Sequence, residues 1–198
     1  MLLGMAVAVS HADAGAAFNA QSFQIFGGIP DGSSAITPAS RGGASLPHGL
    51  MARTIVFPSA LPPGSILIRT GARRLYFILP GGKAIEYHVG VGREGFAWSG
   101  ANSVSRKAEW PGWRPPPEMI ARERRRGHAL PAYMPGGPDN PLGARAIYIG
   151  ATAYRIHGTN QPWSVGQAVS SGCIRMINDE VIDLYARVRV GAAVIVEN

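Results

Sequence analysis

Three short apolar segments joined by tight turns constrain the fold of this chain more than any other feature. Strands are expected at residues 65–69, 73–79 and 84–89, with turns at Thr70-Gly71 and Pro80-Gly81-Gly82 between them. Apolar and polar residues alternate in the third segment, as in a strand with one buried face. The sequence therefore predicts a three-stranded meander in which neighbouring strands run antiparallel.

The rest of the chain adds strands and few helices. The 26 glycines and 16 prolines indicate abundant turns, and the 46% hydrophobic content is enough for a core. We expect a mainly β domain with two or three short helices. Further strands are expected at residues 54–57, 104–110, 144–149, 153–157 and 193–196, and short helices at 118–126, within 163–169 and after 178.

The last helix has the clearest signals. Asn178 is a favourable N-cap, and the acidic residues that follow it suit the positive end of a helix dipole. Gly191 ends the helix. A core-facing apolar stripe with helical spacing is formed by Val181, Leu184, Tyr185 and Val188.

The segment from His157 to Met176 carries the candidate chemistry and reads H-G-T-N-Q-P-W-S-V-G-Q-A-V-S-S-G-C-I-R-M. It contains Cys173, the only cysteine, which excludes an intramolecular disulfide. A free thiol with a pKa of about 8.5 needs a base to act as a nucleophile near neutral pH, and His157 is a candidate. A buried, inert thiol is the alternative, but the small polar residues before Cys173 favour a loop at a site.

These motifs resemble the signature of the L,D-transpeptidase (YkuD-like) catalytic domain, a family that remodels bacterial peptidoglycan. H-G-T begins at His157, and the cysteine of S-S-G-C-I-R-M follows sixteen positions later. The resemblance runs from about Leu61 to the C-terminus and departs at Ser171, where the family often has histidine. It implies the mixed β-sandwich of that family over a catalytic domain at residues 52–198.

The resemblance also implies residue roles. Cys173 is the nucleophile, His157 the base, and the Gly158 backbone carbonyl orients the imidazole. The backbone N–H groups of Gly172 and Cys173 form the oxyanion hole. For Arg175 a structural ion pair with Asp179 or Glu180 remains the alternative to binding a substrate carboxylate. The residues assigned to substrate binding are Arg175, Asn160, Ser170 and Ser171.

The reaction implied is attack by Cys173 on a peptidoglycan stem tetrapeptide, with release of D-alanine and formation of a thioester. An amine of another stem then accepts the acyl group, and no metal or organic cofactor is needed. Two alternatives remain: an L,D-carboxypeptidase or cysteine peptidase that uses water, and a non-catalytic basic module that binds the wall. The expected partners are peptidoglycan stem peptides, and we expect a monomer.

The net charge and the aromatic residues of the chain suggest further hypotheses. The net charge of +7 favours anionic partners, but no nucleic-acid motif is present. The glycines of residues 90–95 lack the spacing of a nucleotide-binding fingerprint. Trp110 and Trp113 either line a substrate groove or cap the core. A solvated helix face is the interpretation of the basic cluster Arg122, Arg124, Arg125 and Arg126.

The N-terminus has features of an export signal. Residues 2–9 are apolar, and Ala12-Asp13-Ala14 has the small-x-small form of a cleavage site. We expect residues 1–14 to be the remnant of a signal peptide, residues 15–51 to be a flexible arm, and the protein to reside in the periplasm or cell envelope. Eight apolar residues are too few to cross a membrane, so no transmembrane segment is expected.

Overall fold

The computed structural model describes residues 51–93 and 98–198. The expected signal peptide and nearly all of the expected arm lie outside these residues. The described part confirms the meander: β2 (Ile66–Arg69), β3 (Arg74–Leu79) and β4 (Lys83–His88) pair in antiparallel register. A short strand, β1 (Arg53–Val56), adds to the free edge of β4. Among the described residues, no helix is long and apolar enough to cross a membrane.

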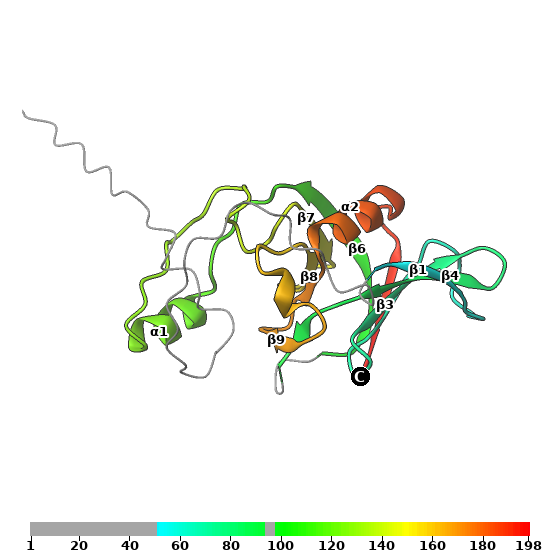
Figure 1. Ribbon diagram of the computed structural model, residues 1–198, viewed down its shortest axis with the longest axis horizontal. Coiled ribbons are helices and arrows are strands. Elements are labelled where there is room, and N and C mark those ends of the chain that lie inside the picture. The colour runs from blue at the N-terminus through cyan, green and yellow to red at the C-terminus, as the bar shows by residue number, and fades with distance from the viewer. Residues whose placement is uncertain (1–50, 94–97) are drawn as a thin grey trace, which may run out of the picture.

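A long strand, β6 (Gly100–Glu109), joins this meander to the half of the sheet that carries the site (Figure 1). Its first residues pair with β11 (Ala193–Glu197), and those from Val104 onward pair with β7 (Arg145–Ile149). The ladder is irregular between Val104 and Arg106, and such a bulge bends a strand and increases its twist. The sheet therefore curls at β6.

The complete sheet has nine strands in the order β1-β4-β3-β2-β11-β6-β7-β8-β10. It is mixed, because β11 runs parallel to β2, and β10 (Ile174–Arg175) runs parallel to β8 (Arg155–His157). A separate parallel pair consists of β5 (Val91–Gly92) and β9 (Ala168–Ser170). The mainly β, mixed architecture with two α-helices agrees with the expected fold class.

Helix α2 (Asn178–Arg187) packs on this sheet over β7. Val181, Leu184 and Val188 are buried in the main core, as the apolar stripe predicted. The N-cap prediction was wrong: Ile177 occupies that position and makes no side-chain capping bond. The oxygen of the Asn178 side chain instead accepts hydrogen bonds from backbone N–H groups of two other segments.

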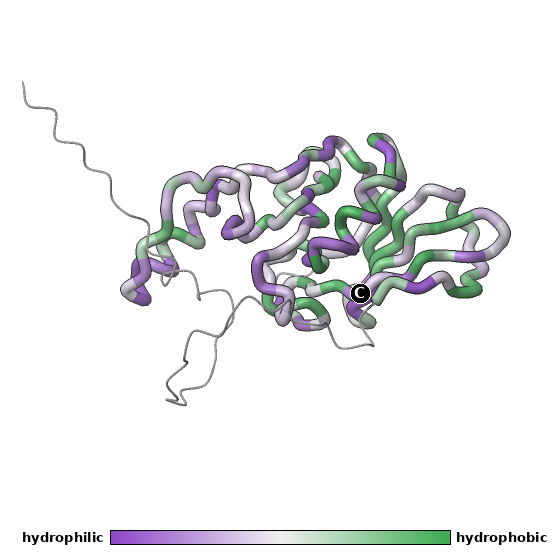
Figure 2. The backbone as a smooth tube through the Cα atoms, turned by 45° about the horizontal axis from the view of Figure 1, so that its top comes forward, coloured by the Kyte–Doolittle hydropathy of each residue, from purple (hydrophilic) through white to green (hydrophobic). Residues whose placement is uncertain are grey.

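Helix α1 (Pro117–Arg125) lies at the opposite end of the molecule from β1 and β4 (Figure 1). Figure 2 shows that this end is mostly hydrophilic, whereas strands of the sheet are mostly hydrophobic. Trp113 is buried in a small second core with Met119 of α1, whereas Trp110 is 45% exposed. The structure thus places Trp113 in a core, while Trp110 remains available at the surface.

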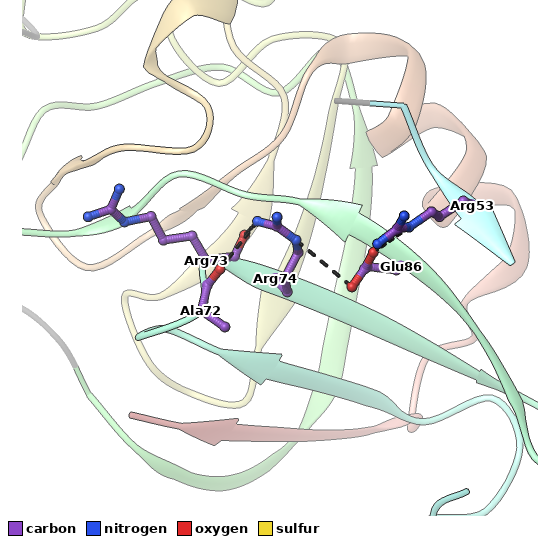
Figure 3. Close-up of polar contacts among 5 residues, drawn as sticks. All are labelled: Arg53, Ala72, Arg73, Arg74 and Glu86. Carbon is purple, nitrogen blue, oxygen red and sulfur yellow. Dashed lines mark hydrogen bonds and ion pairs between the residues drawn. The ribbon is translucent and has the colours of Figure 1, made fainter. Parts of the chain in front are cut away.

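The segment 162–170 is less helical than expected. Only the 3-10 turn η2 (Pro162–Ser164) is helical, and Gly166 follows with a φ of 83°. Arg73 ties this segment to the meander, because its guanidinium donates to the Gly166 carbonyl at 2.9 Å. In Figure 3 the side chain of Arg73 extends away from the Glu86 carboxylate, toward which Arg53 and Arg74 both point.

Candidate active site

The ladder between β8 and β10 brings the two halves of the motif together. Arg175 pairs with His157 in parallel register, and the Met176 N–H donates to the His157 carbonyl at 2.9 Å. Cys173 directly precedes β10 and lies two residues before Arg175, so its backbone is placed diagonally across the ladder from His157. Strands about 4.8 Å apart with a rise of about 3.3 Å per residue separate such diagonal backbones by about 8 Å. Two side chains can close this distance.

His157 ends β8, as predicted, and its ring has a fixed orientation. Ring Nδ1 lies 2.5 Å from the Gly158 carbonyl oxygen. Because a carbonyl only accepts, Nδ1 carries the proton and Nε2 is left as the basic nitrogen. The Gly158 carbonyl therefore holds the position at which the sequence motif places it.

The surroundings of His157 keep the imidazole neutral. Burial lowers the pKa of His157 to about 3, with a further lowering from the charges of Arg175 and Arg155, although the hydrogen bond to Gly158 opposes both. The side chain is only 4% exposed. A neutral imidazole at neutral pH can accept a proton, which is the state that a general base requires.

Asn178 holds the backbone around this histidine. Its Oδ1 accepts the N–H of Ala144 at 3.0 Å and the N–H of Thr159 at 3.2 Å. A Cβ on Gly158 or on Gly143 would overlap this same oxygen. The glycine of H-G-T is therefore required by close packing against helix α2, in addition to the role of its carbonyl as the acceptor that orients the imidazole.

The turn before the cysteine is closed by Ser170. Its hydroxyl donates to the Cys173 carbonyl at 2.6 Å and accepts the Gly172 N–H at 3.2 Å. Gly172 has a φ of 103°, a conformation that residues with a Cβ rarely adopt. Ser170 is buried, and its hydroxyl group both donates and accepts a hydrogen bond within this turn. An oxyanion would therefore have to replace Ser170 as the acceptor for the Gly172 N–H, and the Cys173 N–H is the other predicted donor.

The cysteine itself is partly exposed, and its sulfur lies 3.9 Å from the Ala153 carbonyl oxygen. Arg175 is 7% exposed and donates to Ser164 Oγ at 3.4 Å. Burial lowers the pKa of Arg175, while the nearby Cys173 opposes that shift. The alternative, an ion pair of Arg175 with Asp179 or Glu180, is not among the salt bridges of residues 51–93 and 98–198, and Glu180 accepts no hydrogen bond from a side chain there.

The remaining predicted substrate residues occupy different surroundings. Asn160 donates to the Asp139 carbonyl at 2.8 Å, which connects the motif to the loop at residues 134–143. Ser171 lines a small cavity together with Arg175 and two arginines of α1. The expected solvated face holds for Arg126, which is exposed, whereas Arg122 is partly buried. Both line this cavity with residues some 50 positions away, which nothing in the sequence pattern indicates.

Sequence reasoning also missed groups next to the cysteine. Trp98 stacks on Tyr154 with ring centroids 4.9 Å apart, and Tyr154 follows the Ala153 carbonyl that contacts the sulfur. Neither residue belongs to the motif, so no spacing signal pointed to them. Within residues 51–93 and 98–198, no group of three or more His, Cys, Asp or Glu side chains is placed to hold a metal ion.

Comparison with known proteins identifies the fold and the motif together. The family model described as YkuD, L,D-transpeptidase catalytic domain, matches residues 63–196. The probable L,D-transpeptidase ErfK/SrfK of Escherichia coli K12 is 39% identical over 145 residues, which cover 71% of this chain and 46% of that protein. The probable L,D-transpeptidase YbiS of the same strain is 38% identical over the same coverage. The chain thus spans about half the length of these curated relatives.

Solved structures have the same fold. L,D-transpeptidase 3 of Mycobacterium tuberculosis is 15% identical, with a TM-score of 0.52 over 69% of this chain and 62% of that chain. A Brucella melitensis protein described as a probable carnitine operon oxidoreductase is 40% identical, with a TM-score of 0.51 over 74% of this chain and 92% of that one. Its described activity differs from that of the other relatives.

Proposed function

The chain belongs to the family of L,D-transpeptidase catalytic domains, and from that premise we propose that it is a peptidoglycan L,D-transpeptidase with Cys173 as nucleophile. Residues 52–198 are the catalytic domain. The donor is a stem tetrapeptide, and the bond broken is the one before its terminal D-alanine. The acceptor is an amine of a second stem peptide or of another wall-linked molecule.

In the first half of the reaction, Nε2 of His157 takes the thiol proton as the sulfur attacks the scissile carbonyl carbon. The carbon–nitrogen bond then breaks, the imidazolium returns the proton to the leaving amine, and D-alanine departs. A thioester joins the shortened stem to Cys173. The backbone N–H of Cys173, joined by that of Gly172, stabilises the oxyanion.

In the second half, the acceptor amine attacks the thioester carbonyl while His157 takes its proton. The carbon–sulfur bond breaks, and the thiolate recovers a proton from the imidazolium. Attack by water would instead give a free carboxylate, which is the L,D-carboxypeptidase or cysteine peptidase alternative. Both reactions use the same pair of side chains and differ only in the acceptor.

The observation that carries this proposal is the orientation of His157. Burying an imidazole and fixing its Nδ1 on a carbonyl leaves a neutral base at the end of β8, beside the strand β10 that follows Cys173. A non-catalytic wall-binding module has no use for this arrangement, because burial of a histidine only costs stability at acidic pH. The apolar start of the chain and the peptidoglycan substrate support residence in the periplasm or cell envelope.

Product analysis separates the enzyme hypotheses. The purified protein is incubated with a stem tetrapeptide, with and without an amine acceptor, and the products are identified by mass spectrometry. We expect D-alanine release in both cases and a cross-linked product with the amine. Hydrolysed tripeptide alone at saturating amine would identify a carboxypeptidase. Undiminished D-alanine release by the Cys173→Ala variant would eliminate the thioester mechanism.

A further inference from the structure

A small basic cavity lies between helix α1 and the segment that carries the nucleophile. Its walls include Arg122, Glu123 and Arg126 from α1, Arg93 from the segment after β5, and Ser171 and Arg175 from the cysteine segment. Ser171 and Arg175 each lie two residues from Cys173, one on either side. The cavity is therefore adjacent to the point of attack, although α1 comes from a separate part of the chain.

The cavity has an excess of positive charge. Among the residues that the structure describes, four guanidinium groups line it, against the single carboxylate of Glu123. That carboxylate is buried and accepts from Arg122 Nε at 3.2 Å and from Arg126 Nη1 at 3.3 Å. The ring of His128 lies 3.4 Å from its other oxygen. Glu123 therefore orients the two arginines and leaves the charge of the group strongly positive.

The size of the cavity restricts what enters it. Its volume of about 30 Å³ has room for one or two water-sized groups. A carboxylate fits this space, whereas a ring or a whole side chain does not. Guanidinium groups suit carboxylates, because their planar N–H donors match the two oxygens in a bidentate arrangement.

We propose that this cavity is a binding site for a carboxylate group of the donor stem peptide, and that α1 supplies two of its arginines. The proposal rests on the function proposed above and adds the group that the enzyme recognises. Two carboxylates lie within reach of a site so close to the nucleophile. One is the terminal carboxylate of the leaving D-alanine, and the other is a side carboxylate of the residues that precede the scissile bond.

The test measures equilibrium binding of a fluorescently labelled stem tetrapeptide to the full-length Cys173→Ala protein, so that no turnover interferes. Arg122→Gln and Arg126→Gln are introduced together. We expect the Kd to rise about tenfold or more, because hydrogen bonds to charged groups are worth about 1.5–3 kcal/mol each. The matched control is Arg124→Gln with Arg125→Gln, which removes the same charge from neighbouring residues that do not line the cavity and changes the Kd less than about threefold, in line with surface charges.

Amidated peptides identify the carboxylate. Binding of a peptide whose terminal carboxylate is amidated, and of one whose upstream carboxylates are amidated, is compared in both proteins. The peptide that lacks the recognised carboxylate binds weakly to the parent protein. Its affinity falls little further in the Arg122→Gln, Arg126→Gln variant, because amidation and substitution remove the same interaction. The site would be refuted if the variant weakened the fully amidated peptide as much as the native one, or if the control pair had the same effect.

Folding and function are controlled separately. Because loss of both arginines leaves Glu123 buried without two of its partners, thermal unfolding is measured, and Glu123→Gln is added if the pair of substitutions unfolds the protein. Native protein that binds through this cavity and releases no D-alanine would refute the proposed function and retain the site. If the native protein releases D-alanine and the Arg122→Gln, Arg126→Gln variant binds the peptide as tightly as the parent protein does, the site is refuted and the proposed function is retained.

Discussion

His157 is the residue whose surroundings decide the proposed chemistry. Its Nδ1 is committed to the Gly158 carbonyl, and burial with two nearby arginines holds its pKa at about 3. A histidine of ordinary pKa, about 6.5, would be half protonated in mildly acidic solution and unable to act as a base. The arrangement also means that the resting imidazole is neutral, instead of the imidazolium found in some cysteine enzymes.

The pH dependence of the reaction follows from this charge state. The kcat/KM for D-alanine release should show no inflection from His157 between about pH 5 and about pH 7, because protonation of the ring occurs only near its lowered pKa. The measurement is a pH–rate profile of the native enzyme, with Ser171→Ala as a comparison that should retain the shape of the curve. An acid limb centred near pH 6.5 would show that the imidazole is not shielded as described.

At the level of single residues, the motif was informative where the chemistry is local. The Gly158 carbonyl contacts the His157 ring as the motif indicated, whereas the pairing of His157 with Cys173 stays a prediction. Asn178 was misinterpreted because its preference for N-caps is a local tendency, and here two long-range backbone donors occupy its side chain. The cavity that Arg122 and Arg126 line was missed for the related reason that their neighbours come from distant segments.

Helix α2 acts on the site through its first residue. The Asn178 side chain connects the start of β7, the backbone after His157 and the helix itself. Asn178→Ala should therefore lower the free energy of unfolding by about 1–3 kcal/mol, because it leaves two backbone donors without their acceptor. It should also lower kcat, since the Gly158 carbonyl then orients the imidazole less firmly.

Denaturant unfolding and D-alanine release measure the two effects. Asp179→Ala is the matched control, because Asp179 is the next residue of the same helix turn and is exposed. It should change stability by less than about 1 kcal/mol through the helix dipole. Equal losses of stability and kcat in both variants would mean that Asn178 acts only through the stability of the helix.

The strands of the meander were predictable because each has local apolar patterning and a turn next to it. The pair β5 and β9 was missed, since strands of two and three residues have too few positions for a period to be recognised. The helix expected within residues 163–169 is reduced to η2, because Gly166 takes a left-handed conformation and the residues after it pair with β5.

At the scale of the whole molecule, the parallel pairing of β10 with β8 places the segment that follows Cys173 beside the strand that His157 ends. Local patterns do not predict that β11 inserts between β2 and β6, or that β6 pairs with one half of the sheet and then the other. The pairings of β11 join segments about 90 to 130 positions apart. The fold class was predictable from the strands and the family motif, whereas strand order depends on packing across the entire chain.

The central claim is that the scissile acyl group passes through a thioester on Cys173. The most direct measurement is the intact mass of the protein, taken by rapid quenching during reaction with a stem tetrapeptide and without an amine acceptor. We predict an adduct of the mass of the tripeptide acyl group, located on Cys173, formed with release of D-alanine and removed by hydroxylamine. D-alanine release without an adduct at any time, or an adduct on another residue, would contradict this account.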